Sequence, residues 1–371
     1  MAATSGPLPG TGHRPLIPPA LWQRRAGLPP TRPLAATIET GRPLAIAEGV
    51  LLLRLPLPFA LNHVNVYLLD EADGWTIVDC GLDTAAARRI WDEVLSSPPL
   101  GGRPVRQVVV THHHPDHVGL AGWLAARCGV PVRMSAGELA VAGRYADPRR
   151  DVVAERLPLW HEHGLPRALA LELLDHMPRY AVQVHPLPPR VETVDTSRPL
   201  MLGGRAWRPL VGRGHSPEHL SLLAEDGSLM IGGDQVLPSI TPNIAVWPGG
   251  DADPLRSYLE SLRGFEPIEA RTLLLPSHRQ PLHGIATRVE EIRRHHEERL
   301  AAVLAACTEP MTCHAMLPAL FGRSLRNEEL GFGLGEAIAH LNFLESEGLL
   351  QSWRDPDGRR RYARRPDIAS T

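Results

Sequence analysis

Short apolar runs separated by turn residues dominate the first part of the chain after residue 40. Residues 50–55, 64–69 and 75–79 are apolar or alternating runs of strand length, and they predict three β-strands. Asp73-Gly74 lies between the last two runs and predicts a tight hairpin turn. Residues 106–110 form a β-branched run that predicts a fourth, buried strand.

Helical periodicity alternates with these strands. Residues 83–97 predict a helix with Asp83 or Thr84 as its cap, and residues 117–126 predict another. Residues 137–180 read as largely helical, whereas runs at 200–202, 205–210, 220–224, 229–231 and 273–275 predict strands. Residues 254–263 and 285–306 predict two more helices. Alternating strands and helices of this kind are typical of an α/β fold.

The two ends of the chain differ from the middle in composition and in the pattern of apolar residues. Residues 1–40 are rich in Pro, Gly, Thr and Arg without a sustained period, and they predict a flexible arm. After Pro310, helices are expected at 313–321, 325–330 and 335–347, followed by a hairpin. Three helices and a hairpin form the winged-helix pattern. We therefore expect an arm at 1–40, a catalytic domain at 41–306 with a helical insert at 137–195, and a winged-helix-like domain at 307–371.

Composition narrows the class of protein. The 371 residues carry a formal net charge of −2, which gives no global reason to expect a nucleic acid or a membrane as partner. The four cysteines form no C-x-x-C pair, which fits a reducing cytoplasm. No apolar stretch is long enough to predict a membrane span, and the N-terminus lacks the pattern of a signal peptide.

The histidines carry the chemistry. His112, His114, Asp116 and His117 lie within six residues, at the junction between a predicted strand and a predicted helix. Residues two apart point to the same side, so His112 and His114 can share one metal ion while Asp116 and His117 reach a second. Two such ions can generate hydroxide at neutral pH. A solvated polar loop is the ordinary alternative, and four potential ligands at this spacing make it the weaker one.

Three later segments offer further ligands in the same context. His215 lies in a turn between two predicted strands, Asp234 ends a strand in Gly232-Gly233-Asp234, and His278 ends another in Pro276-Ser277-His278. His283 competes with His278 for the last position. His113 is not expected to bind metal, because it points away from its neighbours.

These motifs, in this order, resemble the metallo-β-lactamase superfamily over roughly residues 45–300. The resemblance implies a four-layer αββα sandwich with the active site at one edge. It implies two divalent metal ions, with Zn²⁺ expected in preference to Fe or Mn. It also implies a bridging hydroxide as the nucleophile, oriented by Asp116. The implied ligands are His112, His114 and His215 for one ion and Asp116, His117 and His278 for the other, with Asp234 between them.

The resemblance extends beyond the ligands. It places Asp79 behind the metals, and the C-terminal winged-helix domain is similar to the lactamase-B-like 2 branch. Two departures concern the substrate: Arg279 stands where relatives often have Gly, and Cys80 where many have Thr. Arg279 is therefore expected to bind an anionic substrate group. His219 is either a hydrogen-bond partner behind the metals or a surface residue.

The reaction predicted is hydrolysis of an ester, thioester, lactone or similar small-molecule bond in the cytoplasm. Two alternatives stay open, a single-stranded RNA endonuclease and a nucleic-acid-binding regulator with a structural metal site; a mononuclear iron oxygenase would use fewer ligands. Both nucleic-acid alternatives rely on arginines of the predicted wing, which are equally explained as a solvated or packing surface. No membrane partner is expected, and a homodimer is left open. The wing arginines are Arg354, Arg359, Arg360, Arg361, Arg364 and Arg365.

Overall fold

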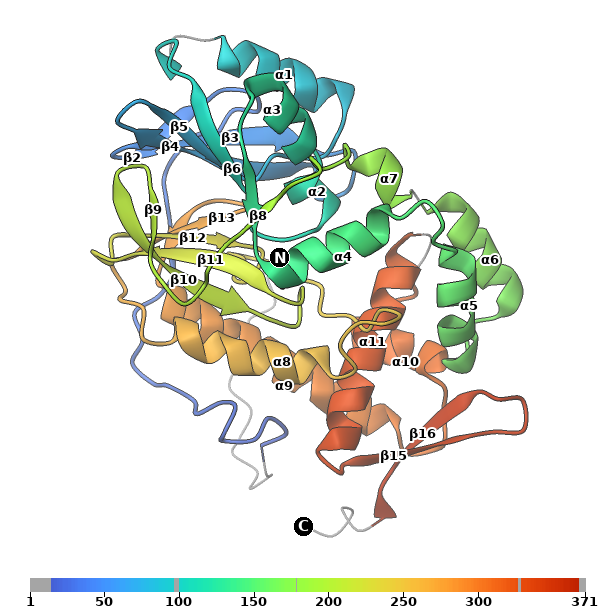
Figure 1. Ribbon diagram of the computed structural model, residues 1–371. Coiled ribbons are helices and arrows are strands. Elements are labelled where there is room, and N and C mark those ends of the chain that lie inside the picture. Colours follow the sequence, from blue (N-terminus) through green and yellow to red (C-terminus); the bar gives the residue numbers. More distant parts are fainter. Residues whose placement is uncertain (1–14, 97–99, 178, 326–327, 367–371) are drawn as a thin grey trace.

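The computed structural model describes residues 15–96, 100–177, 179–325 and 328–366 (Figure 1). In this part of the chain, two seven-stranded sheets pack face to face, with helices on both outer faces. The αββα sandwich expected from the sequence is therefore present. No described helix is long and apolar enough to cross a membrane.

The first sheet joins an antiparallel meander to parallel strands. Its order is β2 (Leu44–Ala47), β3 (Val50–Pro56), β4 (His63–Glu71), β5 (Gly74–Val78), β6 (Val105–Val109), β7 (Val132–Met134) and β8 (Glu192–Thr193). From β2 to β5 neighbours run antiparallel, and from β5 onward they run parallel. The carboxyl ends of β5, β6 and β7 therefore lie at one edge of the sheet.

In the second sheet, one of the six pairs of neighbouring described strands is parallel. Its order is β1 (Arg32–Pro33), β14 (Leu282–His283), β13 (Leu273–Pro276), β12 (Leu229–Gly233), β11 (His219–Ala224), β10 (Arg205–Gly212) and β9 (Leu200–Leu202). Strands β12 and β13 are parallel, so both end at the same edge. Asp234 and His278 follow these two strands closely.

Alternate side chains of the strands enter two different cores. In β4, Val64 and Val66 pack under the helices α1 (Ala85–Leu95) and α3 (Ala121–Cys128), whereas Tyr67 and Leu69 pack between the sheets. Both faces of the sheet are thus buried, which explains why its strands read as nearly continuous apolar runs. Thr84, one of the two expected caps, accepts the N–H of Ala87 at the start of α1.

The predicted helical insert forms four helices beside the edge where these strands end. They are α4 (Ala136–Ala146), α5 (Val152–Glu162), α6 (Arg167–His176) and α7 (Tyr180–Gln183). α4 lies in front of the sheets, and α5 and α6 lie next to the C-terminal helices (Figure 1).

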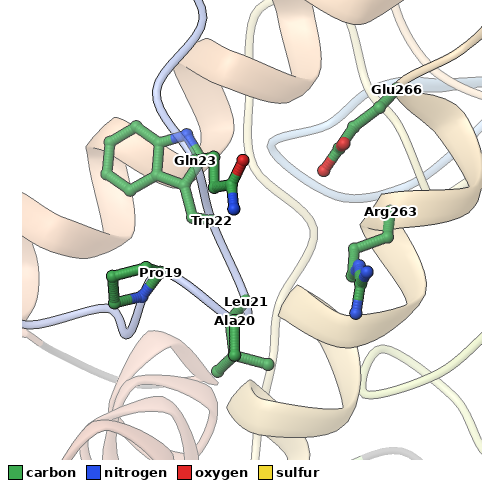
Figure 2. Close-up of a pocket in the computed structure, with 7 residues that line it drawn as sticks. All are labelled: Pro19, Ala20, Leu21, Trp22, Gln23, Arg263 and Glu266. Atoms are coloured by element: carbon green, nitrogen blue, oxygen red, sulfur yellow. The ribbon is translucent and has the colours of Figure 1, made fainter.

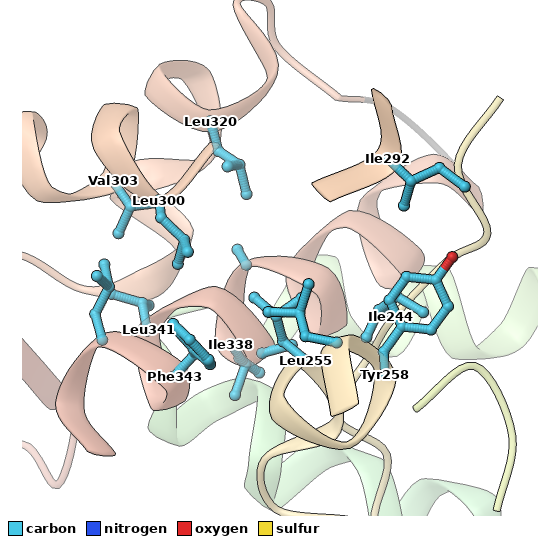
Figure 3. Close-up of a cluster of buried hydrophobic side chains, with 14 of the residues drawn as sticks. Ile244, Leu255, Tyr258, Ile292, Leu300, Val303, Leu320, Ile338, Leu341 and Phe343 are labelled. Atoms are coloured by element: carbon cyan, nitrogen blue, oxygen red, sulfur yellow. The ribbon is translucent and has the colours of Figure 1, made fainter. Parts of the chain in front are cut away.

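The second sheet and the C-terminal segment share one core. Helices α8 (Pro254–Ser261) and α9 (Ile285–Ala306) pack with α10 (Cys313–Phe321) and α11 (Glu328–Ser346) around Tyr258, Leu300 and Ile338 (Figure 3). The hairpin β15 (Leu350–Arg354) and β16 (Arg360–Arg364) follows α11. The C-terminal segment is therefore packed on the sandwich through apolar side chains. Its winged-helix arrangement stays a prediction.

One expected C-terminal helix is absent as a separate element. The sequence predicts helices at 325–330 and 335–347, but within the described residues a single α11 runs from Glu328 to Ser346. Gly331, Gly333 and Gly335, residues of low helix propensity, lie along it. They remain inside the helix because side chains of neighbouring elements lie close to them: Trp160 against Gly331, and Ala245 against Gly335. Tertiary packing thus outweighs their low helix propensity.

The N-terminal arm is also more ordered than expected where the structure describes it. Residues 1–14 lie outside the described part. The backbone N–H groups of Leu16 and Ile17 donate to the Glu297 carboxylate, Trp22 Nε1 donates to Glu290, and Arg32–Pro33 forms strand β1. Ile17 and Trp22 are buried. Isolated apolar residues between prolines carry no period, which is why the sequence alone predicts a flexible arm here.

A surface pocket of about 320 Å³ lies between this arm and the segment after α8 (Figure 2). Trp22 lines one side, and Arg263 and Glu266 line the other. None of the expected metal ligands contributes to this pocket.

Candidate metal centre

The predicted ligands come together where the strands of both sheets end. The histidine segment follows β6 and leads into the short helix α2 (Pro115–Val118). His215 lies between β10 and β11, Asp234 follows β12, and His278 follows β13. Strand ends at one edge bring these four segments, far apart in sequence, to a single point.

Three imidazoles form the first half of the site. His112 Nε2 lies 2.9 Å from His114 Nδ1 and 3.3 Å from His215 Nε2. Three nitrogens at such spacing can face one cation. His112, His114 and His215 are accordingly one of the groups whose ligand atoms all lie within 4.8 Å of one another.

The second half contains a carboxylate and two imidazoles. Asp116 Oδ2 lies 3.6 Å from His117 Nε2 and 3.4 Å from His278 Nε2. His117 and His278 are almost fully buried. His283, the competitor of His278, is instead turned toward the carbonyl of Arg271, to which its Nδ1 donates.

Asp234 stands between the two halves. Its Oδ1 lies 3.6 Å from His117 Nε2 and 3.4 Å from His278 Nε2, and its Oδ2 lies 3.6 Å from His215 Nε2. One carboxylate oxygen thus faces each half. This is the placement expected of a ligand shared by two cations.

The donor set fits divalent metal ions. Two ligand atoms each about 2.0–2.1 Å from a tetrahedral zinc lie about 3.4 Å from each other, which is close to the separations around Asp234. These separations are long for hydrogen bonds. His117 Nε2 and Asp234 Oδ1 are buried and have no hydrogen-bond partner. Burying such atoms unpaired is costly, and a cation between them would satisfy both.

Four of the imidazoles are oriented by contacts on their outer side. The Nδ1–H of His215 donates to the carbonyl of Asn243, and that of His278 donates to the carbonyl of His63. His117 Nδ1 donates to Asp79 Oδ2, and His112 Nδ1 lies 3.0 Å from the hydroxyl of Thr111. Each contact turns Nε2 inward and leaves its lone pair free for a metal.

The Asp79 carboxylate accepts hydrogen bonds from both Thr111 and His117. Its Oδ1 accepts the backbone N–H of Thr111, and its Oδ2 accepts the hydroxyl of Thr111 and Nδ1 of His117. Asp79 has φ = 63°, a backbone conformation that non-glycine residues rarely adopt. The carboxylate therefore lies behind the ligands, in the place that the resemblance implies.

Electrostatics differ between the two halves. Burial, and then the neighbouring imidazoles, lower the pKa of His112 and of His114 well below the ordinary histidine value. Both rings are therefore neutral near pH 7, as metal binding requires. Burial also lowers the pKa of His278, but Asp234 and Asp116 outweigh it and raise that pKa to about 10. The second half thus attracts positive charge.

Two other predicted residues lie beside the cluster. His219 is fully buried and its Nε2 accepts the backbone N–H of Asp234, so it is not a surface residue. A Cβ at Gly233 would lie 2.4 Å from that Nε2, which shows how closely the backbone passes His219. The backbone of Arg279 is fixed, since its N–H donates to His63 Nε2, but its side chain is exposed.

A further residue beside the cluster is Glu138, a fully buried carboxylate at the start of α4. Its Oε2 accepts the backbone N–H of His113 and lies 2.6 Å from His113 Nδ1. Its Oε1 accepts the hydroxyl of Ser216 and the N–H of Glu218. Glu138 therefore ties together the two loops that carry His112, His114 and His215. No motif in the sequence marks it.

Comparison with known proteins agrees with this geometry. The model of the Metallo-beta-lactamase superfamily matches residues 60–278, and that of the Metallo-beta-lactamase-like C-terminal domain matches residues 300–365. The chain is 28% identical over 320 residues to the probable metallo-hydrolase YqjP of Bacillus subtilis (strain 168), a match that covers 82% of this chain and 95% of YqjP.

Solved structures show the same fold along most of the chain. A beta-lactamase domain protein from Burkholderia ambifaria is 39% identical, with a TM-score of 0.83 over 89% of this chain and 96% of that one. A metallo-beta-lactamase family protein from Thermus thermophilus is 30% identical, with a TM-score of 0.74 over 86% of this chain and 100% of that one. Together with the histidine and aspartate cluster at the strand ends, these matches show that the chain belongs to the metallo-beta-lactamase superfamily.

Proposed function

We propose that this metal-dependent hydrolase holds two divalent ions, preferably Zn²⁺, and cleaves an ester, thioester or lactone. One ion would be held by His112, His114 and His215, and the other by Asp116, His117 and His278. The observation that carries the proposal is Asp234, whose two oxygens face the two halves separately.

When bound, the metal ions supply an activated water at neutral pH and polarise the bond to be cleaved. The chain supplies the remaining functions. Asp116, whose Oδ2 faces His278, would orient the attacking water and hold its proton. Asp79 and Thr111 fix the ligand rings, and Glu138 fixes the loops that carry them. In this proposal, the helices of the insert shape the space in which the substrate binds.

Metal analysis together with a substrate panel tests the proposal. We expect about two metal ions per wild-type chain and turnover of at least one thioester, ester or lactone. His114→Ala should lower both metal content and turnover, because it removes a ring of the first half. Glu172→Ala, at an exposed position of α6, is a matched control and should change neither. Turnover that persists in metal-free protein would contradict the proposal.

The arginines of the predicted wing are relevant to the alternative function, cleavage of RNA. Arg354, Arg360 and Arg361 are paired with the carboxylates of Glu162, Glu345 and Asp355, respectively. These contacts support the packing interpretation of the wing.

We therefore expect that replacing Arg359 and Arg364 by Gln changes ester turnover by no more than about twofold, as for ordinary surface positions. Single-stranded RNA incubated with wild type, with this double variant and with His114→Ala is the relevant measurement. Cleavage that needs both His114 and the two arginines would instead establish the RNA endonuclease.

A further inference from the structure

The insert carries a cluster of arginines on α4, on α5 and on the segment between them. Arg144 lies in the last turn of α4, Arg150 just before α5, and Arg156 within α5. Arg150 and Arg144 lie against the Tyr145 ring, with guanidinium carbons 4.2 Å and 5.1 Å from its centroid. Arg156 lies 4.8 Å from the centroid of Trp247. Arginines thus lie against two aromatic rings of this region.

Two of these arginines form no ion pair within the described part of the chain, although the Glu155 carboxylate is near enough to interact with both. Arg150 donates hydrogen bonds to both carboxylate oxygens of the neighbouring Glu155. Among the described residues no carboxylate lies within ion-pair distance of Arg156 or of Arg144. Arg156 Nη1 reaches only the sulfur of Met177, and Arg144 donates to the carbonyls of Pro248 and Gly249.

Burial makes the missing counter-ion costly. The Nε atoms of Arg144 and Arg156 are both buried without a hydrogen-bond partner. Burial, more than any neighbouring charge, lowers the pKa of Arg156, which shows how far the guanidinium is withdrawn from water. Both residues keep partial solvent exposure, which their Nε atoms do not share. A partly buried cation without an anion is destabilising unless something pairs with it.

The cluster is attached to the metal centre on two sides. The Tyr145 ring lies 5.4 Å from the ring of His113, which is itself 4.7 Å from that of His114. Trp247 follows four residues after Asn243, whose carbonyl accepts Nδ1 of His215. The cluster is therefore connected to the 112–114 loop through Tyr145, and to the segment that orients His215 through Trp247 and Pro248.

We propose that Arg156 and Arg144 bind an oxyanion group, a carboxylate or a phosphate, of the substrate whose ester or thioester is cleaved at the histidine cluster. The guanidinium fork matches such groups in a bidentate manner. The inference rests on the proposed function and narrows its substrate class to anionic acyl compounds. It assigns anion recognition to the insert, whereas the sequence suggested Arg279.

A matched pair of thioesters tests the inference, one with a terminal carboxylate and one with an uncharged amide of the same size. We expect Arg156→Gln to lower kcat/KM for the carboxylate compound about 10- to 100-fold, mainly through KM, as the loss of a charged hydrogen bond implies. The amide compound should change less than about twofold. Arg144→Gln should repeat this selectivity, and Arg149→Gln, at an exposed neighbour, should not.

Anion binding separates this inference from the hydrolase proposal. Calorimetric titration of inorganic phosphate and of acetate into chelator-treated protein should show binding that Arg156→Gln weakens and Arg156→Lys partly restores. This result supports the anion site even if no thioester is turned over. Equal losses with both thioesters, or anion binding unchanged in Arg156→Gln and Arg144→Gln with thermal unfolding intact, would overturn it.

Discussion

Asp234→Asn is expected to abolish turnover and to empty both halves of the metal site together. The side chain is nearly isosteric, so packing is preserved, but the negative charge shared by His117, His215 and His278 is lost. Loss of a residue behind a metal ligand already costs about 10- to 100-fold in affinity or activity. Loss of the residue that faces both halves should cost more than about 100-fold in each.

Elemental analysis of purified Asp234→Asn, beside turnover of the best panel substrate, measures this effect. Asp226→Asn is a matched control, because Asp226 is an exposed aspartate in the turn between β11 and β12, at the opposite end of β12 from Asp234. It should retain full metal content and activity. A full complement of two metals in Asp234→Asn would show that Asp234 is not the shared ligand.

Glu138→Ala is expected to weaken metal binding although Glu138 touches none of the seven expected ligands directly. The change leaves four donors of the two ligand loops without their acceptor, those of His113, Ser216 and Glu218. Hydrogen bonds to a charged group contribute about 1.5–3 kcal/mol each and are not additive. We expect the free energy of unfolding to fall by about 3 kcal/mol and metal affinity to fall about 10- to 100-fold.

Denaturant unfolding and competition with a chelator measure the two effects separately. Burial alone would raise the pKa of Glu138, but its hydrogen bonds, led by that from His113, lower it to about 2. Its stabilising contribution is thus complete above the ordinary carboxyl pKa of about 4.3 and is lost as the pH falls through about 2. The difference in the free energy of unfolding between Glu138→Ala and wild type should therefore become smaller as the pH falls toward about 2. Glu172→Ala should show neither effect, and unchanged chelator competition in Glu138→Ala would refute the role of Glu138.

The four segments that carry the expected ligands could be predicted to meet because each of them comes after a strand. Short apolar runs predict strand ends within a residue or two, and parallel strands end at one edge. A histidine or aspartate after such a run, as at His112, Asp234 and His278, is therefore placed by the sheet itself. The alternation of strands and helices predicted an α/β fold, and the resemblance to the superfamily implied the sandwich.

Glu138 and Arg156 could not be identified this way. Both belong to the helical insert, whose position depends on how helices pack on the sheet edge rather than on strand register. A glutamate at the start of a helix usually faces solvent. Only the docking of α4 against the 113 and 216 loops buries Glu138. The ordered conformation of the N-terminal arm could not be predicted for a related reason, since it depends on contacts with Glu290 and Glu297 of a distant helix.

The outer partners of the ligand rings differ in how they tolerate genetic change. His215 and His278 donate to backbone carbonyls, which every amino acid provides. Orientation of these two rings can therefore survive many substitutions at positions 243 and 63. His112 and His117 both depend on the side chain of Asp79, one of them through Thr111. Among these outer partners, Asp79 is therefore the position where a single substitution disturbs two ligand rings at once.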